Sequence, residues 1–127
     1  MRIAIDTNRH VDFAKVLPES VEGLRRADEI LVPFVVLGEL RAGFAGGART
    51  GKNEANLVRF LDSRRVDLVF ADEGTTHHYA QLFHQLRRQG TPIPTNDLWI
   101  AALVVQHDLH LFARDAHFDH LSQIPRL

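Results

Sequence analysis

The stretch Pro94–Asp115 constrains the fold of this chain more than any other. It opens with a proline and two polar residues, a helix-start signal. Leu98–Val105 is then apolar on every side, and a helix of that kind must be buried. The apolar run Leu109–Ala113 follows almost at once and is typical of a strand in a covered sheet. The stretch therefore predicts a buried helix–strand unit with a carboxylate near each end, Asp97 and Asp115.

The rest of the chain alternates between short apolar runs and helical patterns. The other strands are expected at Ile3–Ile5, Ile30–Val32 and Val66–Phe70. Helices are expected at Val11–Val16, Glu19–Ala27, Pro33–Phe44, Glu54–Arg64 and Asp72–Gln89, with a polar loop at Ala48–Asn53 and a last turn at His117–Leu121. This order predicts an α/β protein, a three-layer α/β/α sandwich around a mostly parallel sheet. There is no repeat or linker, so residues 1–127 are expected to form a single domain.

Composition excludes several classes of protein. The 127 residues are 45% hydrophobic and 24% charged, which fits a globular protein with a real core. The absence of cysteine excludes disulfides, thiolate zinc sites and cysteine nucleophiles. No apolar run approaches membrane-spanning length and Met1 leads straight into a strand, so we expect a cytoplasmic protein without a signal peptide. The net charge of −1 means that any nucleic-acid binding must come from local basic patches.

Carboxylates occupy unusual places in this pattern. Asp6 and Asp115 follow the first and last predicted strands, and sites in parallel sheets form beyond the carboxyl ends of strands. Glu39 has only small or apolar neighbours at helical spacing, so it is expected to point from the face that packs on the sheet. Each acid has an ordinary explanation by itself: Asp97 as a helix-start residue, Asp6 and Asp115 as turn or loop residues, and Glu39 as an edge residue that reaches solvent or pairs with Arg41 or Arg114.

The four acids together indicate a metal site. Four converging carboxylates repel one another, which raises the pKa of at least one of them, and a divalent cation removes the conflict. Oxygen ligands without a thiolate favour Mg²⁺ or Mn²⁺. Such a site activates water for in-line attack on a phosphate.

Four motifs carry a resemblance to a known family. They are IDTN at 5–8, GELRAG at 38–43, PTNDLWIAA at 94–102 and ARDAHFDHL at 113–121. On these residues the chain resembles the PIN-domain ribonucleases, and among them the VapC-like toxins of toxin–antitoxin pairs. The resemblance implies a Mg²⁺- or Mn²⁺-dependent endoribonuclease with a catalytic, metal-binding quartet of Asp6, Glu39, Asp97 and Asp115.

The resemblance also implies supporting residues and partners. Asn8 and Thr7 would hold the loop after the first strand, and the partners would be RNA, a small cognate antitoxin and a second copy of the chain in a homodimer. Two positions depart from the family pattern: Ala113 replaces a frequent hydroxyl residue, and Arg9 stands where many relatives are apolar. The predicted RNA contacts are Arg9, Arg41, Arg49 and Lys52.

Other patterns in the sequence point elsewhere and are weaker. Gly46–Lys52 matches GxxxxGK, but Asn53 follows in place of a hydroxyl residue and a helix precedes it, so a P-loop is disfavoured. The histidines on the long helix at Asp72–Gln89 lack metal-ligand spacing, although His117 or Asp119 could lie beside the quartet. Trp99 is expected in the core.

Two other classes of function remain open from the residues alone. One is an aspartate-based phosphatase or phosphotransfer domain, although a phosphatase would want aspartate where Asn8 stands. The other is a non-catalytic binding domain in which the acidic residues are structural. A metal titration separates the second class from an enzyme.

Overall fold

Four short parallel strands form the centre of the computed structural model, which describes residues 1–127. In sheet order these are β3 (Val66–Val69), β2 (Glu29–Pro33), β1 (Arg2–Ile5) and β4 (His110–Phe112). β1 pairs with β2 on one side and with β4 on the other, in registers that place Ile3 beside both Ile30 and His110. Ile3–Ile5 is fully buried, as expected for a strand covered on both faces. The predicted parallel sheet is confirmed.

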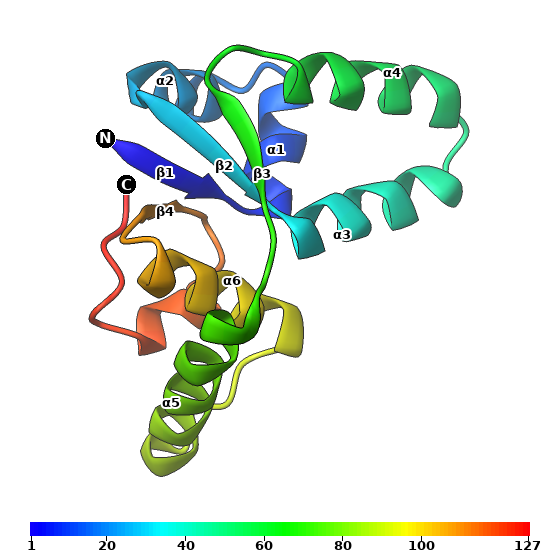
Figure 1. Ribbon diagram of the computed structural model, residues 1–127. Coiled ribbons are helices and arrows are strands. Elements are labelled where there is room, and N and C mark those ends of the chain that lie inside the picture. The colour runs from blue at the N-terminus through cyan, green and yellow to red at the C-terminus, as the bar shows by residue number, and fades with distance from the viewer.

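Helices cover this sheet on both faces and account for most of the chain. They are α1 (Thr7–Ala14), α2 (Pro18–Arg26), α3 (Phe34–Ala45), α4 (Thr50–Leu61), α5 (Glu73–Gln89) and α6 (Thr95–Gln106), with a 3₁₀ turn η1 (Ala116–His120) near the end. The chain passes from β1 to β2 to β3 in one direction and then returns beyond β1 to β4, so right-handed crossovers place α5 and α6 opposite α1 and α2. Figure 1 shows this division, with α3 and α4 forming a hairpin that extends past the sheet. The three-layer prediction is confirmed.

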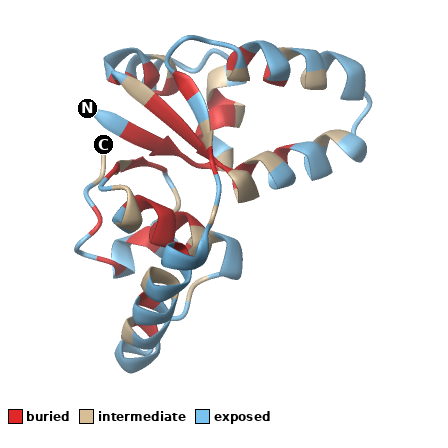
Figure 2. Cartoon of the chain, in the orientation of Figure 1, coloured by how far each residue is buried: buried red, intermediate tan, exposed pale blue.

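Local sequence signals explain where the helices begin and end. Asp72 and Thr75 form a reciprocal capping box at the start of α5, and Gly90 ends that helix in the left-handed conformation at φ 72°. In α6 the residues from Leu98 to Val104 are buried except the half-buried Trp99, and Figure 2 shows this part of the helix largely in red, whereas Val105 was predicted to be buried and is exposed. No helix is both long enough and apolar enough to cross a membrane.

Several predicted boundaries and faces were wrong. α1 begins at Thr7, because Asp6 caps it, and α4 begins at Thr50 within the predicted loop. Phe83 on α5 is 43% exposed, because α5 packs on α6 mainly through Leu82 and Leu86. Val58 on α4 is likewise 44% exposed. Trp99 is only half-buried, with its ring 4.3 Å from that of Tyr79.

Candidate metal centre

The candidate site lies where the carboxyl ends of β1 and β4 meet. β1 and β4 are neighbours in the sheet, and the Asp6 backbone N–H donates to the Phe112 carbonyl at 3.3 Å. The residues that follow β1 and β4 therefore lie side by side although more than one hundred positions separate them. The N-terminus of α6 is close by, because Asp97 in its first turn contacts His117 just beyond Asp115.

Asp97, Asp115 and His117 form the tightest group. One ligand atom from each lies within 4.8 Å of the others. The Nδ1 atom of His117 is 2.9 Å from Asp97 Oδ2 and 2.9 Å from Asp115 Oδ1. This group lies at a hollow of about 430 Å³ without a hydrophobic residue in its lining, which consists of Glu39, Pro94, Thr95, Asn96, Asp97, Asp115 and His117.

The turn after β4 fixes this geometry. Asp115 caps η1 by accepting a hydrogen bond from the His117 backbone N–H at 2.9 Å. The next residue, Phe118, is buried to 1% exposure and anchors the turn in the core. The imidazole of His117 therefore stands on a short turn that is held from both sides. The sequence names His117 only as a possible neighbour of the quartet, because the histidines lack a tight paired-ligand spacing with a clear partner.

Asp6 lies beneath the group and does not line the hollow. It is 5% exposed and caps α1 by accepting a hydrogen bond from the Arg9 backbone N–H at 2.8 Å. Burial raises the pKa of Asp6 to about 6, against the lowering effects of that hydrogen bond and of the Arg9 charge. The charges of Asp115 and Asp97 add smaller increases to the pKa. Repulsion between the acids is therefore present, but desolvation is the main cause of the shift.

Asp97 lies in the first turn of α6, but its carboxylate does not cap the helix. No side chain caps the N-terminus of α6, and the Asp97 carboxylate faces His117. Burial raises the pKa of Asp97, the hydrogen bond from His117 lowers it, and the charge of Asp115 raises it again. The hydrogen bond to Asp97 raises the pKa of His117 in turn. The pair thus shares a proton that a bound cation would displace.

Glu39 reaches the hollow from α3, but the prediction that it points from the packed face was wrong. It is exposed, because α3 leaves the sheet early and buries only Val36 and Leu40. Thr7 Oγ1 donates to Glu39 Oε1 at 3.0 Å and so joins the start of α1 to α3. The alternative partners are engaged elsewhere: Arg41 pairs with Glu54, and Arg114 pairs with Asp12.

The hydrogen bonds that hold the loop after β1 come from Asp6 and Thr7, the neighbours of Asn8. Asn8 is exposed and makes no side-chain hydrogen bond, whereas Thr7 bonds Glu39 and Asp6 bonds the Arg9 backbone. Ala113 is buried, and its carbonyl accepts a hydrogen bond from Arg126 at 2.7 Å.

The predicted RNA contacts divide into three groups. Arg9 is 8% exposed, with its guanidinium 4.5 Å from the centre of the Phe112 ring and paired with Glu19 at 3.2 Å, so its side chain is largely buried here and its contact with RNA stays a prediction. Arg41 is partly exposed and paired with Glu54 at 2.7 Å. Arg49 and Lys52 are exposed at the far end of the α3–α4 hairpin, beside a separate hollow near α1.

The weaker sequence patterns have no site around them. Gly46–Lys52 connects α3 to α4, so no strand precedes it and the P-loop reading is excluded. The histidines of α5 join no group that could hold a metal ion. Asp119 pairs with Arg126 at 2.9 Å, outside the group.

The donor set fits a divalent cation. Two carboxylates and an imidazole nitrogen converge within bridging distance of one ion, and a third carboxylate, that of Glu39, lines the same hollow. Burial is the main cause of the raised pKa of Asp97, and the charges of Asp115 and Glu39 add to it, so a cation at this point would be favoured.

Known proteins share this sequence pattern and fold. The profile of the PIN domain family matches residues 3–124. Ribonuclease VapC1 of Haemophilus influenzae (strain R2866) is 30% identical in an alignment of 107 positions that covers 79% of this chain and 78% of that protein. The chain therefore belongs to the PIN domain family.

Solved structures agree with this assignment. The structure of VapBC-1 from nontypeable Haemophilus influenzae matches with a TM-score of 0.87 at 23% identity, covering 100% of this chain and 97% of that one. VapBC-5 of Mycobacterium tuberculosis, a member of the VapBC family of toxin–antitoxin systems, matches with a TM-score of 0.74 at 25% identity over 99% and 98% of the two chains.

The pKa of Asp6 predicts a pH-dependent stability. The folded pKa of about 6 lies above the ordinary 3.8, so the folded protein holds this proton more tightly than the unfolded chain. The free energy of unfolding should therefore fall as pH rises through this window, by up to roughly 3 kcal/mol relative to Asp6→Asn, which cannot ionise. Urea unfolding of both proteins in EDTA at several pH values from 4 to about 7 measures the difference.

An exposed carboxylate on β3, Asp67, provides the control for this experiment. Asp67→Asn should show no comparable pH-dependent difference from the wild type. A difference between Asp6→Asn and the wild type that stays constant across the range would contradict the assignment.

Proposed function

We propose that this protein is a divalent-cation-dependent endoribonuclease of the VapC kind, the toxin of a toxin–antitoxin pair. The observation that carries the proposal is the convergence of Asp97, Asp115 and His117 at a polar hollow in a PIN-domain chain. The name of the related Haemophilus protein, a ribonuclease, supports the reaction.

Each acid has a distinct part in this proposal. Asp97 and Asp115 hold the cation, which is Mg²⁺ or Mn²⁺ by the preference of hard oxygen donors. Glu39 lies at the same hollow and completes the carboxylate set, with its orientation fixed by Thr7. Asp6 lies beneath and adds negative charge that favours a cation above it. A divalent cation bound there neutralises phosphate charge and makes water more acidic.

The open hollow suits an extended strand. No hydrophobic residue lines it, so the hollow offers no apolar surface on which a base could stack. Its polar lining suits the sugar–phosphate backbone instead. RNA phosphates would meet the exposed cations Arg49 and Lys52, and Arg41 after it leaves Glu54. We propose single-stranded or looped RNA as the substrate.

The burial of Asp6 disfavours a covalent aspartate mechanism. An aspartyl phosphatase needs a reactive carboxylate that is open to substrate at the end of a strand. Asp6 is 5% exposed, and one of its oxygens accepts the Arg9 backbone hydrogen bond. The structure therefore favours hydrolysis by water over transfer through a phosphorylated aspartate.

Asp97→Asn should lower the rate of RNA cleavage at least ~100-fold, because it removes a ligand charge from the centre of the site. It should also remove most of the thermal stabilisation that Mg²⁺ or Mn²⁺ gives the wild type, since the cation binds only the folded site. Cleavage of labelled single-stranded RNA and melting curves, each with metal and with EDTA, measure both effects.

Asp108→Asn is the control, because it removes the charge of an exposed carboxylate at the other end of α6. This variant should cleave RNA at the wild-type rate. Asn96→Asp is unsuited as a control because it adds a charge. Equal cleavage by the wild type with metal and in excess EDTA would refute the proposed function. A wild type that gains no stability from either metal would favour a non-catalytic binding domain.

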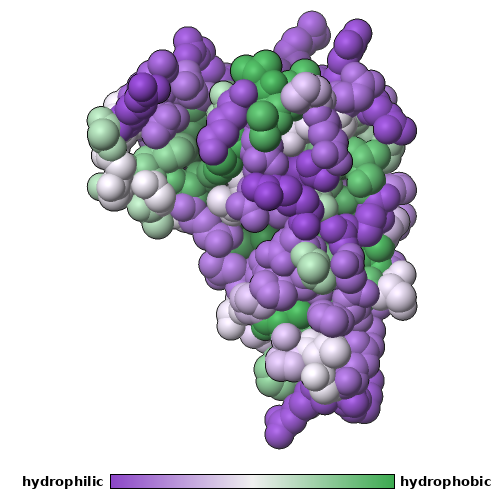
Figure 3. Space-filling view, turned by 180° about the vertical axis from the view of Figure 1, so that it is seen from behind, coloured by the Kyte–Doolittle hydropathy of each residue, from purple (hydrophilic) through white to green (hydrophobic).

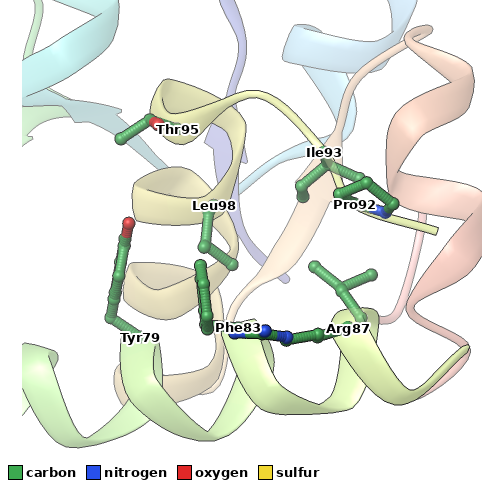
Figure 4. A pocket seen from close by; sticks show the side chains of 8 residues that line it. Tyr79, Phe83, Arg87, Pro92, Ile93, Thr95 and Leu98 are labelled. Carbon is green, nitrogen blue, oxygen red and sulfur yellow. The ribbon is translucent and has the colours of Figure 1, made fainter. Parts of the chain in front are cut away.

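A second copy of the chain is proposed to cover α5. Figure 4 shows Tyr79 and Phe83 of α5 facing Leu98 of α6 across a hollow of about 300 Å³, with Ile93 and Pro92 beside it. Phe83 is 43% exposed, and Tyr79 and Phe83 stack with ring centres 6.4 Å apart. Apolar side chains gathered beside such a hollow are typical of an interface between copies.

Phe83→Asp should convert the proposed homodimer into a monomer, because it places a charge at the centre of the buried apolar surface. Sedimentation velocity at several protein concentrations measures the change. Val58→Asp is the matched control, since Val58 is 44% exposed on α4, away from this hollow, and should leave the dimer intact. A wild type that stays monomeric at high concentration would rule out the homodimer.

A small antitoxin is proposed as the second protein partner. An acidic hollow that takes a cation also takes an arginine of a partner segment through paired charge-assisted hydrogen bonds. Next to α1 there are further hollows with apolar floors, where Phe13 and Phe60 lie among arginines such as Arg64 and Arg65. Seen from behind, the upper part of the molecule shows patches of apolar side chains between hydrophilic ones (Figure 3). These features suit a segment with apolar, acidic and arginine residues.

The small protein encoded beside this chain should inhibit its RNA cleavage. Asp97→Asn should weaken that complex about tenfold, as expected for losing one charge-assisted hydrogen bond. Glu73→Gln changes an exposed acid at the start of α5 and should bind like the wild type. Titration calorimetry in EDTA measures the affinities. A neighbouring product that neither binds nor inhibits would disprove the antitoxin proposal.

A further inference from the structure

His117 adds one nitrogen atom to a site whose other donors are all carboxylate oxygens. Its Nδ1 lies 2.9 Å from an oxygen of Asp97 and 2.9 Å from an oxygen of Asp115. The three atoms belong to the one group in this protein that is compact enough to hold a metal ion. The imidazole also lines the polar hollow, beside Glu39.

The position of this imidazole is built into the fold. The His117 backbone N–H donates to Asp115 Oδ1 at 2.9 Å, so the same carboxylate fixes the turn and contacts the ring. Phe118 anchors the next position in the core, and Arg126 lies over its ring at 5.8 Å. Arg126 also pairs with Asp119 and donates to the Ala113 carbonyl. The turn is thus held at both ends, although the imidazole itself is half exposed.

Three electron-rich atoms at these distances require a positive charge between them. A carboxylate oxygen only accepts hydrogen bonds, so the 2.9 Å contact between Asp97 Oδ2 and His117 Nδ1 needs either a proton or a metal ion between the two atoms. A metal ion in that position would satisfy both aspartates and the ring nitrogen with the side chains near their present places. The arrangement is therefore already that of a mixed nitrogen and oxygen ligand set.

We propose that His117 is a direct ligand of the divalent cation and that it makes this site select Mn²⁺ over Mg²⁺. The inference rests on the proposed function, and it goes further by assigning a residue and a metal. Mg²⁺ is a hard ion that prefers oxygen and keeps its water, whereas imidazole suits the first-row transition metals. Replacing one oxygen donor by a nitrogen therefore favours Mn²⁺.

Metal binding to the purified protein tests the proposal without measuring cleavage. The wild type should bind Mn²⁺ at least ~10-fold more tightly than Mg²⁺, and His117→Ala should lose about tenfold or more in Mn²⁺ affinity, the range seen when a contact at a metal site is removed. The Mg²⁺ affinity should change less than about threefold, because oxygen donors dominate its binding. Electron paramagnetic resonance of free Mn²⁺, with Mg²⁺ as competitor, measures both.

Two further variants sharpen the test. His120→Ala removes an exposed histidine from the same turn, outside the group, and should match the wild type. His117→Asp makes every donor an oxygen and should reduce or reverse the preference for Mn²⁺. Pulsed electron paramagnetic resonance of bound Mn²⁺ should show coupling to a histidine ¹⁴N nucleus in the wild type and His120→Ala, and none in His117→Ala.

The outcomes separate this inference from the proposed function. If the wild type binds both ions but shows no ¹⁴N coupling, or if His117→Ala weakens Mn²⁺ and Mg²⁺ equally, the role of His117 is overturned while the metal-dependent function stands. If the wild type binds neither ion, both fail together. Circular dichroism of each variant shows that the fold is retained, and His117→Asp decides the question if His117→Ala does not fold.

Discussion

The pairing of β1 with β4 is the interaction on which the candidate site depends. It joins the first strand of the chain to the last, places Ile5 beside Phe112, and so brings Asp6 next to the turn that carries Asp115 and His117. Parallel pairing makes both strands end at the same edge of the sheet. A short turn joins the end of α6 to the start of β4, so α6 runs back along the sheet. Burial of the helix holds its N-terminus, which carries Asp97, at the same edge of the sheet.

The electrostatics of the site follow from burial more than from crowding. Asp6 lies under the surface, and loss of water is the leading cause of its raised pKa, with the neighbouring acids as smaller contributors. Asp97 shows the same order, although His117 partly compensates it. The protein thus keeps a partly desolvated group of acids, with the imidazole of His117 in contact with Asp97 and Asp115. A desolvated acidic hollow has a strong preference for a cation, because the field of the carboxylates is little screened there.

The sequence motifs were sufficient to predict the family and the three-layer fold, because both depend on the order of buried runs and on the PTNDLWIAA stretch. They were less reliable for individual side chains. Glu39 has apolar neighbours at helical spacing, yet α3 extends beyond the sheet and leaves it exposed. Arg9 looked like a surface cation, yet it lies against the Phe112 ring. In both cases the decisive neighbours are distant in sequence. Whether Asp6, Glu39, Asp97 and Asp115 act together in catalysis remains a prediction.

The sequence alone determined the elements and the chemistry available at their ends. An apolar run followed by an acid predicts a strand that leads into a polar edge, since backbone periodicity and burial are local properties of the chain. Only the tertiary structure decided which acids meet. It joined Asp97 and Asp115 through His117, linked Glu39 to Thr7, and placed Asp6 beneath them. The reason is that distances between side chains depend on strand register, on how far each helix runs along the sheet, and on how the turns are anchored, and no local pattern encodes these.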